Sequence, residues 1–164
     1  MGGEDGAAVG EAQSALPAVA HGARFLAATL AYRAWALANP APFALIFGTT
    51  IPDYHAPREA TVPAVRDAFA TLLAAPRAAY ATHEAGDAAT SDGEQTNAAV
   101  DRAADHGFPP EVFSALVEGW GEMHGLVMLE LFGHLRPVVP DTAAFFAAAM
   151  RRVAARAGLP PPDE

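Results

Sequence analysis

Residues 118–135, EGWGEMHGLVMLELFGHL, decide how the chain folds, because they combine helical spacing with four glycines. A glycine inside a helix is about 1 kcal/mol less favourable than alanine, so this helix must gain close packing in return. Apolar residues recur at three- and four-residue spacings from Phe113 to Leu135, and the polar stripe beside them stops at Glu122. The half after Glu122 is apolar on nearly every side, which predicts a helix covered by more than one neighbour.

The rest of the chain favours helices as well. Alanine, the best helix former, is abundant, and no stretch alternates strictly between apolar and polar residues. We expect the first long helix to turn Leu26, Leu30, Ala34 and Leu37 toward the core. The expected fold class is all-α, a bundle of six helices or so. Helices are predicted over residues 17–38, 39–48, from about 61 with a break at Pro76, 98–107, 109–135 and 141–157.

The 164 residues suit one domain. Residues 1–16 begin acidic and glycine-rich and are expected to form a disordered leader. The helical domain is expected over residues 17–158, with Gly158 ending the last helix, and residues 159–164 form a proline-rich tail.

Charge and composition exclude several classes of partner. The net charge is −9 and no basic cluster is present, so we expect no direct contact with nucleic acid. The start of the chain lacks the pattern of a signal peptide, and no uncharged apolar run is long enough to span a membrane. We therefore expect a cytoplasmic protein without a membrane partner. The absence of cysteine excludes disulfides and thiolate metal sites.

Two predicted helices carry apolar residues on more than one side, so a second copy of the chain is the expected cover. The sequence predicts a homodimer with a four-helix interface built from the last two helices of each protomer. The predicted interface residues are Gly125, Leu126, Leu129, Phe132, Gly133, Phe145, Phe146, Ala149, Met150 and Val153.

Trp120 and His124 lie one turn apart on a face that we expect to be buried. In one interpretation they line a ligand pocket, with His124 as its polar group; in the other they are a core tryptophan and a hydrogen-bonded core histidine. The same two interpretations apply to the remaining candidate ligand-binding residues, which are Phe43, Phe47, Phe69, Met123 and Met128.

No catalytic or metal-binding motif is present. Glu130 and His134 share a helix face at i, i+4 spacing, yet the sequence holds no HExxH motif and no repeated Glu-x-x-His pair. We expect no catalytic residues, no bound metal and no cofactor. A metal-dependent helical-bundle enzyme, with His124 beside Glu122 or Glu130 as acid and base, stays open as an alternative, as does a structural dimerisation module without a ligand.

The pattern Trp120-x-x-x-His124-Gly125, within LVEGWGEMHGLVMLEL, resembles the motif of the WHG-type C-terminal domain of TetR/AcrR-family transcriptional regulators. The segment AYRAWALANPAPFALIFG, residues 31–48, is similar to the early helices of that domain, and the resemblance covers roughly residues 20–158. It implies a domain that binds a small, mostly apolar effector and dimerises through its last two helices. The helix-turn-helix domain that grips DNA in full regulators is not expected before Pro17, so DNA would be contacted only through a missing domain.

Overall fold

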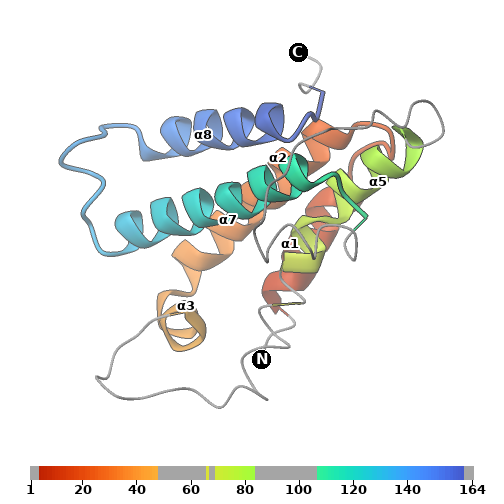
Figure 1. The fold of residues 1–164 in the computed structure, drawn as a ribbon. Helices are drawn as coiled ribbons and strands as arrows, with labels where there is room; N and C mark the ends of the chain where they lie inside the picture. Colours follow the sequence, from red (N-terminus) through yellow and green to blue (C-terminus); the bar gives the residue numbers. More distant parts are fainter. Residues whose placement is uncertain (1–3, 48–65, 67–68, 84–106, 161–164) are drawn as a thin grey trace, which may run out of the picture.

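The computed structural model describes residues 4–47, 66, 69–83 and 107–160. Every labelled element in these ranges is a helix, which confirms the all-α fold class (Figure 1). The helices are α1 (Glu4–Ser14), α2 (His21–Ala38), α3 (Pro40–Phe47), α5 (Ala74–His83), α7 (Pro110–Leu131) and α8 (Thr142–Arg156). Within these ranges no helix is both long and apolar enough to cross a membrane. The helix predicted over residues 98–107 and the start of the one from about residue 61 lie outside the described residues.

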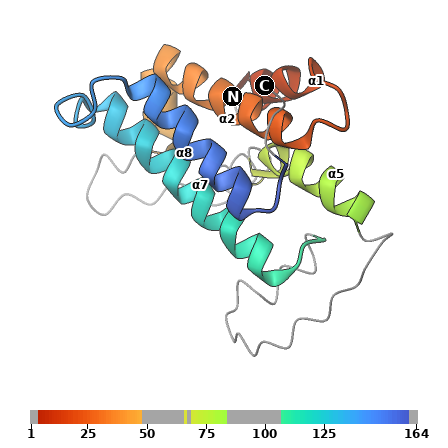
Figure 2. The ribbon, with the colours of Figure 1, turned by 90° about the horizontal axis from the view of Figure 1, so that it is seen from above.

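Helices α7 and α8 lie side by side and run in opposite directions, with α2 packed against both (Figures 1 and 2). Helices α1 and α5 contact the first half of α2, and α3 continues from its other end. The core is therefore centred on α2, and α7 and α8 keep an outward side that no other described helix covers.

The prediction of a disordered leader is wrong for residues 4–14, which form α1 and pack on α2. Val9 and Gln13 are both about 3% exposed, and the Gln13 side-chain amide donates a hydrogen bond to the carbonyl of Thr71 at 3.0 Å. The glycine content suggested disorder, but three alanines and these two buried side chains give α1 enough contact to hold it in place.

Helix α2 turns a different face inward from the one predicted. Phe25, Ala28 and Tyr32 are buried, whereas Leu30 is 37% exposed. The prediction followed the larger leucines, but Ala28 and Ala36 have no exposed surface and allow the neighbours of this helix to pack closely against it.

The break predicted at Pro76 falls three residues earlier, at Leu73. Residues 69–72 are helical, Leu73 is a turn, and α5 begins at Ala74. Pro76 thus lies in the first turn of α5, where its missing N–H removes no helical hydrogen bond.

Helix α7 ends at Leu131, before the Leu135 that the sequence predicts. Gly133 has φ +75°, and its N–H donates to the carbonyl of Glu130 at 3.1 Å while the N–H of His134 donates to that of Leu129 at 2.8 Å. This is the Schellman arrangement, which favours glycine in the left-handed position. Gly133 is therefore a helix terminator, and its place in the dimer interface stays a prediction.

Both ends of α8 match the prediction. The Asp141 carboxylate accepts a hydrogen bond from the N–H of Ala144 at 2.9 Å, which caps the helix. Gly158 has φ +68° and ends the helix, and the Tyr80 hydroxyl donates to the carbonyl of Ala157 at 3.0 Å.

Gly119 allows α7 and α8 to pack closely. A Cβ at this position would overlap the Cγ1 methyl of Val153 and would lie 3.3 Å from its Cβ. At Gly121 and Gly125, in contrast, an added Cβ meets nothing within 4 Å among the described residues. The glycine that serves packing inside the protomer is therefore Gly119, and Gly121 and Gly125 leave open surface.

A buried ion pair joins α2, α7 and α8. The Arg33 guanidinium donates to both oxygens of Glu130, at 2.7 and 2.6 Å, and the Thr142 hydroxyl donates to Glu130 Oε1 at 2.7 Å. The Arg33 side chain is 15% exposed and that of Glu130 8%. The hydrogen bond from Arg33 is the main cause that lowers the pKa of Glu130 below its usual range. Glu130 is thus held by Arg33, while His134 is exposed beyond the end of α7.

Candidate functional site

A pocket lies between α2, residues 69–73 and α7. Its empty volume is about 270 Å³, which includes the solvent-filled space at its open side. Helix α2 contributes two lining residues, the segment before α5 three and α7 four. The lining residues are Phe25, Thr29, Phe69, Leu72, Leu73, Leu116, Gly119, Trp120 and Met123.

The described wall of the pocket is almost wholly apolar. None of these lining residues carries a charge, and the hydroxyl of Thr29 already donates to the carbonyl of Leu26 at 2.9 Å. A charged ligand would lose its hydration here without gaining an ionic partner from these side chains. The pocket suits uncharged, apolar molecules.

The pocket is narrow and is partly open to solvent. Its interior has room for about one water molecule, far less than the roughly 300–1,000 Å³ of most ligand sites. The rings of Phe69 and Trp120 lie 5.3 Å apart at 50°, and Met123 is 1% exposed. A ligand of even one ring must displace these side chains, and the flexible methionine is the easiest to move.

Three of the seven predicted ligand-binding residues, Phe69, Trp120 and Met123, lie on the pocket wall. Phe43, Phe47, His124 and Met128 are not among the lining residues. The six lining residues that were not predicted are Phe25, Thr29, Leu72, Leu73, Leu116 and Gly119. No signal in the sequence separates these side chains from ordinary core leucines and phenylalanines, because both occur at the same helical spacing.

His124 belongs to an aromatic cluster beside the pocket. The Tyr32 hydroxyl and His124 Nδ1 are hydrogen-bonded at 2.9 Å, and the imidazole centroid lies 5.4 Å from the ring of Phe43 and 4.9 Å from that of Phe47. This geometry corresponds to the hydrogen-bonded core histidine of the two interpretations. Burial lowers the pKa of His124, which favours the neutral ring.

The lowered pKa of His124 predicts that the folded protein is less stable at acidic pH. A histidine whose pKa is lower in the folded protein binds fewer protons there, so its stabilising effect is complete above its ordinary pKa of about 6.5 and is lost as the pH falls through the folded pKa. We expect the free energy of unfolding to fall between about pH 7 and about pH 5, and to fall less steeply in His124→Gln. Urea titrations at several pH values measure both slopes; equal slopes would contradict this account of His124.

The outward side of α7 and α8 carries large apolar side chains. Phe132 is 59% exposed, Leu129 44% and Phe145 38%, while Gly125 and Leu126 are half-buried. Exposed side chains of this size, grouped on two neighbouring helices, mark an interaction surface more often than a solvated one.

Four residues predicted for the dimer interface are in the protomer core instead. These residues, Phe146, Ala149, Met150 and Val153, are at most 1% exposed. They form the stripe of α8 that packs on α2 and α7, so a partner cannot reach them. The sequence pattern had shown two apolar stripes on this helix without showing which of them faces inward.

Comparison with known proteins agrees with the all-helical fold. Residues 25–153 match the family model of the tetracyclin repressor-like C-terminal domain, and the chain belongs to this family. It is also similar to the HTH-type transcriptional regulators Rv1816 of Mycobacterium tuberculosis and Mb1846 of Mycobacterium bovis. Each is 30% identical over 140 residues, which cover 79% of this chain and 57% of the relative. The chain thus spans little more than half the length of these relatives.

Proposed function

We propose that the chain is the effector-sensing and dimerisation domain of a TetR/AcrR-family transcriptional regulator. The observation that carries this proposal is the position of α7, which lines the apolar pocket with Leu116, Trp120 and Met123 and presents Leu129 on its outward side. A ligand that displaces the pocket wall therefore acts on the helix that a second protomer would cover.

The mechanism is an equilibrium between two packings of the helices. The narrow pocket represents the ligand-free packing, and an effector shifts the equilibrium only by as much as it binds a packing with a wider pocket more tightly. A shift of α7 changes how two protomers are oriented. In relatives named as helix-turn-helix regulators, such a change would alter the spacing of the two DNA-reading domains.

The effector is a small, uncharged and largely apolar molecule, since the described pocket wall offers no charge. We expect benzyl alcohol or indole to raise the melting temperature at saturating concentration, and benzoate and benzylamine of similar size to leave it unchanged. A ligand at about 100 times its Kd stabilises the folded protein by about 2.7 kcal/mol.

A pair of variants locates the binding site. Phe69→Ala alters the pocket wall and should change the affinity for benzyl alcohol, whereas Phe47→Ala removes a similar ring from the neighbouring cluster and should not. If none of the neutral compounds shifts the melting temperature, or if both variants respond alike, the pocket is not an effector site.

A structural dimerisation module without a ligand is the second candidate, and the small interior of the pocket favours it. A void with room for about one water molecule is within what a well-packed core contains. The same ligand titrations separate the two functions, because the structural module predicts dimers that respond to none of the compounds.

A further inference from the structure

The outward sides of α7 and α8 form one continuous surface, which we call the α7/α8 face. Its residues recur at spacings of three and four along each helix and are half-buried or exposed. They are Glu118, Glu122, Gly125 and Leu129 on α7, and Phe145, Ala148, Arg152 and Arg156 on α8.

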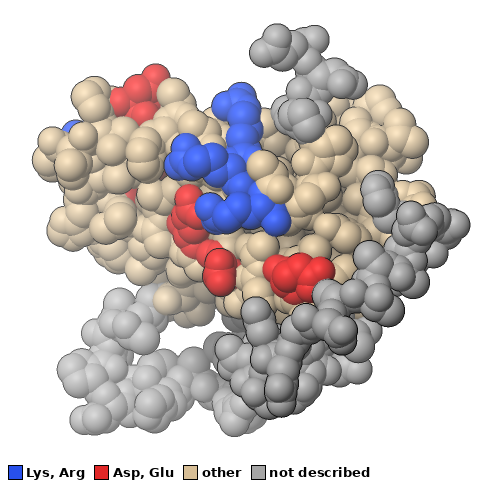
Figure 3. Space-filling view, turned by 45° about the horizontal axis from the view of Figure 1, so that its top comes forward, with Lys and Arg blue, Asp and Glu red and all other residues tan. Residues whose placement is uncertain are grey.

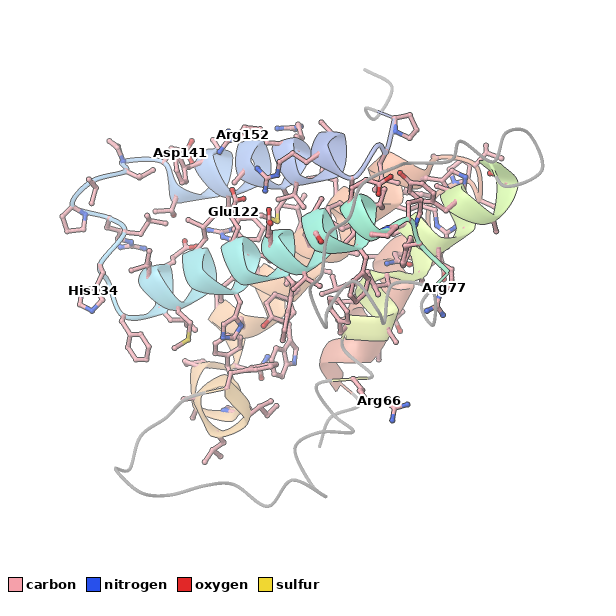
Figure 4. The ribbon with its side chains drawn as sticks, in the orientation of Figure 1. Arg66, Arg77, Glu122, His134, Asp141 and Arg152 are labelled. Carbon is pink, nitrogen blue, oxygen red and sulfur yellow. The ribbon has the colours of Figure 1, made fainter. Side chains whose placement is uncertain are left out.

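The face has an apolar half and a charged half. Leu129 and Phe145 lie toward the α7–α8 connection, and Figure 3 shows a largely uncharged surface at that end with an acidic patch at its edge. Arginine and acidic side chains lie next to each other nearer the middle of the molecule, and Figure 4 labels Glu122 and Arg152 among them. On this face α7 supplies the acidic groups and α8 the basic ones.

Two of the four charges have no partner among the described residues. Arg156 Nη2 lies 2.6 Å from Glu122 Oε2, which joins the two helices within the protomer. Glu118 and Arg152 are exposed and, in the described part of the chain, make no hydrogen bond or ion pair. Gly119 of α7 lies against Val153 of α8. Glu118 and Arg152 each precede one of these two residues, so they lie at the same height along the two helices.

The direction of a two-fold axis decides how this face would meet a second copy of itself. A two-fold axis perpendicular to α7 and α8 that crosses them at their middle places the apolar half of one protomer over the charged half of the other. This arrangement buries charges against leucine and phenylalanine. An axis that crosses near the connection joins the apolar halves alone and leaves Glu118 and Arg152 unpaired. An axis that runs along the helices, between α7 and α8, joins like halves and lays each acidic α7 over a basic α8.

We propose that the two protomers are related by an axis along α7 and α8, so that Glu118 pairs with Arg152 of the partner subunit. The level set by Gly119 and Val153 also brings Phe145 opposite residues 126–129 of the partner subunit. This proposal rests on the proposed dimerisation and adds its orientation: apolar contacts supply affinity, and the crossed charges select this one orientation.

Charge reversal tests the pairing. Glu118→Arg and Arg152→Glu each place like charges together, and each should raise the dimer dissociation constant at least roughly ten-fold in sedimentation equilibrium. The double variant restores opposite charges and should return to within about three-fold of the wild type. Arg151→Glu is the matched control: Arg151 is equally exposed but lies about 100° away around α8, so its reversal should leave the constant unchanged.

A second measurement uses the absence of cysteine from the chain. Leu129→Cys mixed with Phe145→Cys should form a disulfide-linked heterodimer under mild oxidation, and neither variant should cross-link well with itself. Dimers that the reversals do not weaken, or that cross-link through one cysteine variant alone, would overturn the proposed orientation while leaving dimerisation intact. A wild-type chain that stays monomeric at about 100 µM would overturn the dimer itself.

Discussion

Replacing Glu130 by alanine is expected to lower the free energy of unfolding by about 3 kcal/mol. The substitution leaves the Arg33 guanidinium 15% exposed, without its carboxylate and above the ring of Phe146, 5.6 Å from its centroid. It also removes the acceptor of the Thr142 hydroxyl at the start of α8. Three helices lose their common polar contact in one step, which is why this effect should be the largest.

The exposed ion pair between α7 and α8 provides the control. Glu122→Ala breaks the pair with Arg156, whose side chains are 31% and 44% exposed, and should lower the stability by less than about 1 kcal/mol. Urea unfolding of both variants at equal protein concentration gives the comparison. Equal losses would mean that the Arg33–Glu130 pair contributes no more than a surface contact.

Gly119→Ala should destabilise the fold by about 2 kcal/mol, although alanine is the better helix former. The added methyl group overlaps Val153, which is 1% exposed and has no room to move outward. Replacing Val153 by alanine removes the methyl group that the new side chain overlaps. The double variant Gly119→Ala/Val153→Ala should therefore lose less stability than the sum of the losses in the two single variants.

Gly121→Ala is the matched control for this prediction. Gly121 is on the same helix, is exposed, and its added methyl group meets no described atom within 4 Å. This substitution should therefore leave stability unchanged or raise it by up to about 1 kcal/mol. If both glycine variants lose stability equally, the contact with Val153 does not control the effect.

The sequence predicted the parts of the fold that local chemistry determines. The all-α class follows from alanine content and helical spacing, and the ends of α8 follow from Asp141 and Gly158, since a cap and a left-handed glycine act within one turn. The apolar character of α7 on several sides also agrees with its position between the core and an exposed face.

The errors arose where tertiary packing selects among equivalent local patterns. Periodicity identifies a stripe on α2 but does not show that the alanine-rich stripe packs closely while Leu30 faces outward. Nor does periodicity distinguish the four glycines of residues 118–135, although Gly119 is the one that lies against Val153. The first residues were predicted to be disordered because local composition shows neither that Val9 is buried nor that Gln13 bonds to the distant Thr71.

The candidate site was only partly predictable for the same reason. Phe69 and Trp120 line the pocket and Phe47 does not, yet all three are half-buried aromatic residues at helical positions. Their difference depends on how α2, residues 69–73 and α7 are placed relative to one another. This arrangement is a property of the assembled core, which spacing along a single helix does not encode.

Sedimentation equilibrium of the wild-type chain tests the central claim, that a second copy covers the α7/α8 face, most directly. A particle of twice the chain mass of 17.0 kDa at about 10 µM is the predicted result. A particle of 17.0 kDa that persists up to about 100 µM would contradict the claim, because Leu129, Phe132 and Phe145 would then remain in contact with water.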